Sequence, residues 1–153
     1  MIETKKRSRW FKRILLAGLI LLAVGGIAIW YIFTEKFSDT SKETAAYTVN
    51  AIDFIKEFQA NDSIANNKYA EKIITVNGLV FETEAADTTI NIKMMDTLTD
   101  AYIIFAFQQE HLKEAKQLKV GDNVSIKGSC SGGAYSQILE TEFVTFKRCT
   151  LNK

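Results

Sequence analysis

Residues 73–84 read IITVNGLVFETE, and at this point the hydrophobic period of the chain becomes two. Ile74, Val76 and Val80 fall on one face of an extended chain, and the residues between them fall on the other. This alternation predicts a β-strand over residues 73–84 with one buried face. Four later stretches show a strand pattern as well, at residues 88–95, 101–107, 123–130 and 135–151.

Helical spacing occurs on both sides of the first three strands. Residues 45–60 place an apolar side chain at every third position, which predicts an amphipathic helix. Residues 65–69 predict a short helical turn with Ser63 as its cap, and residues 108–118 return to helical spacing. Three strands, a helix and two strands is the element order of the OB barrel. We therefore predict a mainly β fold: a five-stranded OB-like barrel with a helix between strands three and four and an added N-terminal helix.

A different composition marks the start of the chain. Residues 14–33 read ILLAGLILLAVGGIAIWYIF, which are twenty residues without a charge. A helix of this length rises about 30 Å, the thickness of a bilayer's hydrocarbon core. Six Lys and Arg residues lie within the first 13 positions, and this basic excess favours a cytoplasmic N-terminus. A cleaved signal peptide fits less well, because the apolar run is long and ends in bulky residues, and a lipoprotein fits less well, because no cysteine follows the run closely. A buried core helix is disfavoured by the flanking charges and by the lack of a polar face.

These features divide the chain into four parts. We predict a basic cytoplasmic tail at residues 1–13, a transmembrane helix at 14–33, a polar linker at 34–44 and an exported OB-like domain at 45–153. Residues 34–153 contain 13 basic and 17 acidic residues, so this part carries a net charge of −4.

The sequence offers no pattern of catalytic or metal-binding residues. His111 is the single histidine, and the two cysteines are not close in sequence, so we expect no metal site and no cofactor. Acids such as Glu82 and Glu140 fall at strand ends and turns, where a solvated side chain is usual. We expect no enzymatic activity.

Strand alternation also selects a candidate binding face. If the apolar residues of the first three strands fill the barrel, their neighbours point outward. These outward residues are Asn77, Phe81, Asn91, Lys93 and Tyr102. OB barrels bind ligands along this face. The alternative is an ordinary wet sheet face covered by the helix at residues 45–60.

Cys130 and Cys149 are candidates for a disulfide, because an exported domain permits one. A straight hairpin turning at Gly132 and Gly133 would separate them, so the bridge requires either that the last strand folds back or that residues 134–146 make an excursion of their own. The alternative is two small, buried, free thiols.

Several motifs together resemble a known family. They are ANNKY at 65–69, Lys72, VNGLV at 76–80, LKVGDNVSIKG at 118–128, Cys130 and CTL at 149–151. In this order they resemble the tRNA-anticodon-binding-like OB family over about residues 45–151. The resemblance implies an OB fold and a small exported or lipid-anchored bacterial protein, and the family name implies tRNA.

Together these observations lead to one functional hypothesis and two alternatives. We expect a single-pass protein of the inner membrane whose extracytoplasmic OB domain binds a protein partner in the cell envelope without catalysis. An oligosaccharide- or nucleic-acid-binding domain is the first alternative, and a cofactor or haem chaperone is the weaker one. Nucleic acid is disfavoured because Lys93 is the single cation on the predicted face and phosphate contacts require positive partners.

The charge asymmetry predicts the topology. A reporter that is active outside the cytoplasm should work when it is fused after Lys153, and a cytoplasmic reporter at the same position should not. Activity of the cytoplasmic reporter alone would contradict the predicted orientation.

Overall fold

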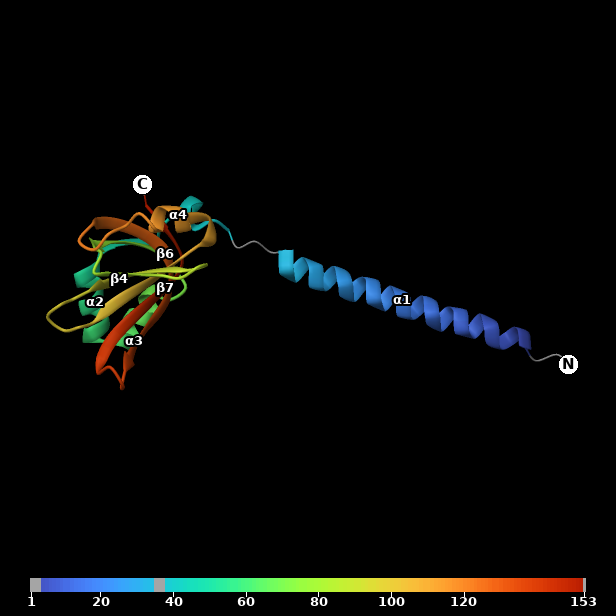
Figure 1. Cartoon of the computed structure of the whole chain (residues 1–153). Helices are drawn as coiled ribbons and strands as arrows, with labels where there is room; N and C mark the ends of the chain where they lie inside the picture. Colours follow the sequence, from blue (N-terminus) through green and yellow to red (C-terminus); the bar gives the residue numbers. More distant parts are fainter. Residues whose placement is uncertain (1–3, 35–37, 153) are drawn as a thin grey trace. The chain divides into compact units, whose positions relative to one another are not determined.

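The computed structural model describes residues 4–34 and 38–152, and it divides the chain into two compact units, Met1–Phe37 and Ser38–Lys153 (Figure 1). Residues 1–3 of the predicted tail, residues 35–37 of the predicted linker and Lys153 lie outside the described residues. Each unit is described by itself.

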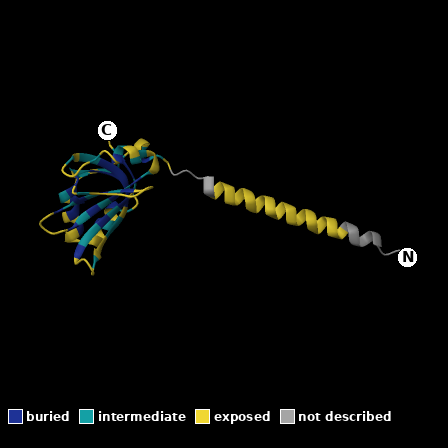
Figure 2. Cartoon of the chain, in the orientation of Figure 1, coloured by how far each residue is buried: buried dark blue, intermediate teal, exposed yellow. Residues whose placement is uncertain are grey.

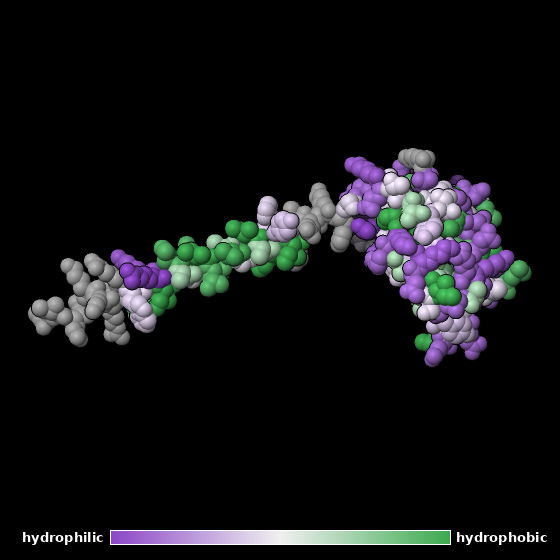
Figure 3. Space-filling model, turned by 180° about the vertical axis from the view of Figure 1, so that it is seen from behind, coloured by the Kyte–Doolittle hydropathy of each residue, from purple (hydrophilic) through white to green (hydrophobic). Residues whose placement is uncertain are grey.

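The first unit is the single helix α1 (Thr4–Thr34). Its segment Trp10–Ile32 has a mean hydropathy of 2.4, and every described side chain on it is exposed (Figure 2). Figure 3 shows a nearly continuous hydrophobic surface along this segment. The helix is therefore long and apolar enough to span a membrane.

The second unit contains the following elements: η1 (Thr40–Lys42), β1 (Tyr47–Asn50), α2 (Ala51–Ala60), α3 (Asp62–Tyr69), β2 (Ile73–Leu79), β3 (Glu82–Ala85), β4 (Ile90–Met95), β5 (Tyr102–Phe107), η2 (Gln109–His111), α4 (Leu112–Ala115), β6 (Asn123–Ser136) and β7 (Thr141–Leu151). The unit is mainly sheet, as predicted. Its described residues form seven strands rather than five.

The strands form one open sheet in the order β1-β2-β6-β7-β5-β4-β3, not the closed barrel that we predicted. The predicted strand at 73–84 is divided at Val80, because β2 pairs with β6 whereas β3 pairs with β4. Only Val80 and Phe81 separate β2 from β3, although these strands lie near opposite ends of the sheet order. The sheet must therefore curl to bring its ends together.

The predicted helix at 45–60 was wrong in its first part. Tyr47–Asn50 is a strand that pairs in parallel with β2, and the helix begins at Ala51. Asn50 marks the change, because its side chain accepts a hydrogen bond from the Ile52 N–H at 2.9 Å and caps α2. Asn61 rather than Ser63 caps α3, with a 2.9 Å bond from the Ile64 N–H. The helical segment predicted at 108–118 is reduced to η2 and α4.

The turn predicted at Gly132 and Gly133 was also wrong, because both glycines lie inside β6 and the turn is at residues 137–140. Gly132 has a φ of +99° beside a register shift in the β6–β7 ladder. A Cβ atom on Gly133 would lie 2.5 Å from Phe58 Cδ1. The Asn66 side chain accepts a bond from the Gly133 N–H and donates one to the Gly133 carbonyl, each at 2.9 Å. The glycine pair therefore forms the docking place for α2 and α3.

Aromatic rings from the helices fill the inside of the curled sheet. Phe54 on α2 lies 5.0 Å from Phe58, 4.9 Å from Tyr69 and 5.7 Å from Phe146, measured between ring centroids. Phe146 in turn lies 5.0 Å from Phe105 on β5. These five rings are at most 2% exposed. The second unit therefore has its own core.

Cys130 on β6 and Cys149 on β7 belong to this core as free, fully buried thiols. Because the hairpin turns at residues 137–140, β7 returns along β6, and Cys149 Sγ packs where Gly128 has no Cβ. Burial raises the pKa of Cys130 to about 11 and raises the pKa of Cys149 as well. The bridge between them stays a prediction.

The two hydrogen bonds between the Asn66 side chain and the Gly133 backbone, here called the Asn66 clamp, can be tested with a matched pair of variants. Asn66→Ala should lower the free energy of unfolding by about 1–3 kcal/mol, because it removes both hydrogen bonds to the partly buried Gly133 backbone groups. Asn67→Ala, on the exposed side of the same helix, carries the same gain in helix propensity and should change stability by less than about 0.5 kcal/mol. Urea denaturation of residues 38–153 measures both values, and equal effects would contradict the clamp.

Thiol alkylation tests the cysteines. In the folded protein neither cysteine should react with a small alkylating reagent, because both side chains are fully buried. After unfolding without reductant, we expect protein purified from the envelope to remain unlabelled, as a bridge requires. Two labelled thiols at this stage would show that no bridge forms.

Candidate binding face

The outer face of β4 centres on Lys93, which is already neutralised. Its Nζ lies 2.6 Å from Glu82 Oε2 and 3.6 Å from Glu84 Oε1, both on the neighbouring strand β3. The same ammonium lies 5.3 Å from the centre of the Tyr102 ring. The hydrogen bond to Glu82 raises the pKa of Lys93, and its side chain is 19% exposed. This cation is therefore occupied by partners of its own chain.

Two stacked rings lie beside Lys93. Tyr102 on β5 and Phe143 on β7 are paired in register, with ring centroids 6.0 Å apart and an interplanar angle of 20°. Asn91 lies two residues before Lys93 on β4 and therefore points to the same face. Asn91, Lys93, Tyr102 and Phe143 thus form one face with rings, an amide and a paired cation. Phe143 was not among the predicted residues, although its alternation with the buried Val144 and Phe146 on β7 could have identified it.

Asn77 and Phe81 are not part of this group. Asn77 lies on β2, in register with Asn50 on β1 and Ser125 on β6. Phe81 follows the end of β2 and is 42% exposed at a cleft beside the N-terminus of α2. The division of the predicted strand at Val80 separates these two residues from the face on β4 and β5.

The segment before β1 covers another part of the sheet. Lys127 on β6 donates to the carbonyls of Ser41 and Glu43, each at 2.9 Å, and Thr40 is buried. His111 Nε2 lies 2.9 Å from Asp39 Oδ1, and this hydrogen bond lowers the pKa of Asp39. Residues 38–43 therefore pack on the domain, whereas α2, the predicted cover, packs in the core. His111 takes part in this packing. No group of three or more His, Cys, Asp or Glu among the described residues is placed to hold a metal.

The β6–β7 hairpin ends in an apolar tip formed by Tyr135, Ile138 and Leu139. These side chains are 56%, 94% and 61% exposed, and the two strands extend past the rest of the sheet (Figure 1). From Gly128 to Phe146 the sequence contains two acids and no basic residue. One of the acids, Glu142, has a buried carboxylate oxygen without a hydrogen-bond partner among the described residues. Its pKa is raised, mainly by burial and to a smaller extent by the negative charge of Asp62. The tip is therefore apolar with an acidic border.

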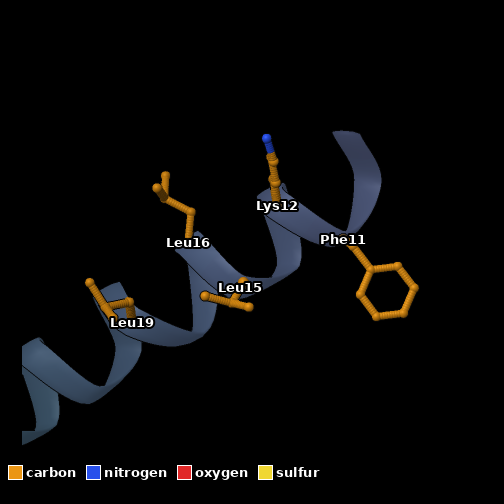
Figure 4. Close-up of a pocket in the computed structure, with 5 residues that line it drawn as sticks. All are labelled: Phe11, Lys12, Leu15, Leu16 and Leu19. Atoms are coloured by element: carbon orange, nitrogen blue, oxygen red, sulfur yellow. The ribbon is translucent and has the colours of Figure 1, made fainter. Parts of the chain in front are cut away.

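One hollow lies on α1 and is lined by Phe11, Lys12, Leu15, Leu16 and Leu19. Figure 4 shows that these side chains project outward from a single helix, with open space between them. On a helix able to span a membrane, such a hollow is what lipid chains would fill, so it is no candidate ligand site.

Among the solved structures that resemble this chain, one has the same fold at low identity. A lipoprotein of Klebsiella pneumoniae subsp. pneumoniae MGH 78578, described as a proposed nucleic acid-binding protein, is 18% identical with a TM-score of 0.54, over 69% of this chain and 91% of that chain. A proposed aspartyl-tRNA synthetase of Leishmania major Friedlin is 8% identical with a TM-score of 0.45, over 77% of this chain and 22% of that one. The asparaginyl-tRNA synthetase of Pyrococcus horikoshii is 15% identical with a TM-score of 0.37, over 55% of this chain and 20% of that one.

No curated protein matches the chain. The profile of the tRNA_anti-like family matches residues 5–142, which is most of the sequence, and this confirms the resemblance that the motifs predicted. The chain belongs to the tRNA_anti-like family, a family of binding-type OB domains.

Proposed function

We propose that this protein is a membrane-anchored module that binds a protein partner on the extracytoplasmic side of the inner membrane, without catalysis. The apolar helix α1 supports the anchor, and the six basic residues before it support a cytoplasmic N-terminus. The Klebsiella neighbour is described as a lipoprotein, which is in keeping with a place in the envelope.

The observation that carries the proposal is the apolar tip of the β6–β7 hairpin. Three large apolar side chains stand exposed on a regular hairpin, and Ile138 is 94% exposed. Clustered exposed apolar residues mark interaction sites in soluble domains. Aromatic and aliphatic anchors of this kind insert into pockets of a partner and contribute most of the binding energy. The acids Glu140 and Glu142 favour a pocket bordered by Lys or Arg.

Nucleic acid binding is the second candidate, because the Klebsiella lipoprotein is described in that way. Two observations disfavour it in this chain. Residues 38–153 carry 12 basic and 16 acidic residues, and Lys93 is neutralised by Glu82 and Glu84. Affinity for phosphate backbones depends on free cations.

The ring pair Tyr102 and Phe143 with Asn91 is better suited to a sugar, so an oligosaccharide is the alternative ligand for this face.

Photocrosslinking in intact cells tests the proposal. A photoreactive amino acid at Ile138 of the full chain should give a defined protein adduct, and the same amino acid at Lys116, an exposed residue directly after α4, should not. Leu139→Asp in the Ile138 background should reduce the adduct about tenfold or more, because it places a charge at the apolar contact. Equal adducts from positions 138 and 116, or no effect of Leu139→Asp, would refute the proposed surface.

A further inference from the structure

A second apolar surface lies at the other end of the helix–sheet core. A cleft of about 780 Å³ opens between the N-terminus of α2, the end of β2, the β4–β5 loop and residues 120–123. The described residues from 38 to 152 expose eight large apolar side chains, and four of them line this cleft. These four are Leu79 (61% exposed), Phe81 (42%), Leu98 (91%) and Val120 (67%). The volume is in the range of small-molecule sites.

Two methionine side chains make the cleft adaptable. Met94 and Met95 are the two methionines of the domain, and both line it. Methionine side chains adjust to ligands of different shape. Gly78 allows this packing, because a Cβ there would lie 2.8 Å from Met94 Sδ.

The backbone around the cleft is already hydrogen-bonded. The Val80 N–H donates to the Asp122 carbonyl, the Val80 carbonyl accepts from Gly121, and the Phe81 N–H donates to the Lys93 carbonyl. An extended peptide therefore cannot add here as a further strand at these residues. Recognition must come from side chains.

One charged residue lines the cleft, and it is an acid without a counter-ion. Asp96 is 5% exposed, and its carboxylate accepts a 3.0 Å hydrogen bond from the Leu98 N–H. No described Lys, Arg or His lies within 4 Å of it as an ion-pair partner. Buried carboxylates are normally paired, since an unpaired charge in a poorly hydrated site is costly. A positively charged ligand group would supply the counter-ion that the described residues do not give Asp96.

The positive end of the α2 helix dipole, which borders the cleft, should repel a bound cation only weakly. The Asn50 side chain already accepts the Ile52 N–H, and Asp53 lies in the first turn of the helix. Both reduce the positive end of the helix dipole.

We propose that this cleft binds a small amphiphilic cation, with its apolar tail against Leu79, Phe81 and the methionines and its ammonium group against Asp96. This site is separate from the apolar tip of the hairpin and does not depend on the protein-binding function proposed above. Its ligand class is an alkyl or aryl amine rather than a fatty acid or a phosphate ester.

Methionine methyl NMR on residues 38–153, the unit with its own core, tests the proposal directly. Three probes share one alkyl chain and differ in charge: octylammonium, octanol and octanoate, each used below its aggregation concentration. Octylammonium should shift the ε-methyl signals of Met94 and Met95 saturably, with a Kd about tenfold or more lower than that of octanoate. Unmoved methyl signals, or equal affinity for octylammonium and octanoate, would overturn the proposal.

Two variants separate charge from folding. Asp96→Asn keeps an oxygen that accepts the Leu98 N–H, so the loop should stay intact, and octanol affinity should change by less than about twofold. The same variant should weaken octylammonium binding about tenfold. Asp100→Asn alters an exposed acid of the same loop outside the cleft and should leave all three affinities unchanged. An equal loss in both variants would mean that Asp96 is not the cation partner.

Discussion

The packing of Phe54 against Phe58, Tyr69 and Phe146 is the constraint on which the domain depends. These contacts hold α2 and α3 inside the sheet, so the sheet must curl around them. The same packing explains why β6 carries two glycines where the helices touch it, because a side chain at Gly133 would collide with Phe58. Every ring of this group lies between residues 54 and 146, so the core of the domain is formed by residues of the second unit.

Much of the sheet could be predicted from the sequence, because a half-buried strand alternates in hydrophobicity whatever its partners are. The strand β1 was missed, since Val49 and Ile52 are spaced as on a helix and Asn50 ends a strand as readily as it caps a helix. Gly132 and Gly133 were misread as a turn because glycine serves turns and close approaches equally. The contacts of Phe58 and Asn66, which are distant in sequence, make this glycine pair a site of close approach rather than a turn.

The candidate sites were predictable in part for the same reason. Alternation placed Asn91, Lys93 and Tyr102 on the outer face, and the structure places all three on one face of the sheet, with Lys93 in contact with Tyr102. Pairing partners are not encoded locally, so the neutralisation of Lys93 by Glu82 and the stacking of Phe143 became visible only in the sheet. The exposure of the hairpin tip and the unpaired burial of Asp96 likewise depend on how distant segments surround them.

Charge distribution connects the fold with the proposed role. Lys93 on the outer face of the sheet is held in an ion pair with Glu82. The β6–β7 hairpin presents apolar side chains bordered by acids. Both features favour the proposed protein partner over a phosphate chain. Fluorescence anisotropy of residues 38–153 with single-stranded DNA and with tRNA at low salt tests most directly whether the domain binds nucleic acid. We expect affinities weaker than micromolar for both. Micromolar or tighter binding that falls steeply with added salt would contradict it.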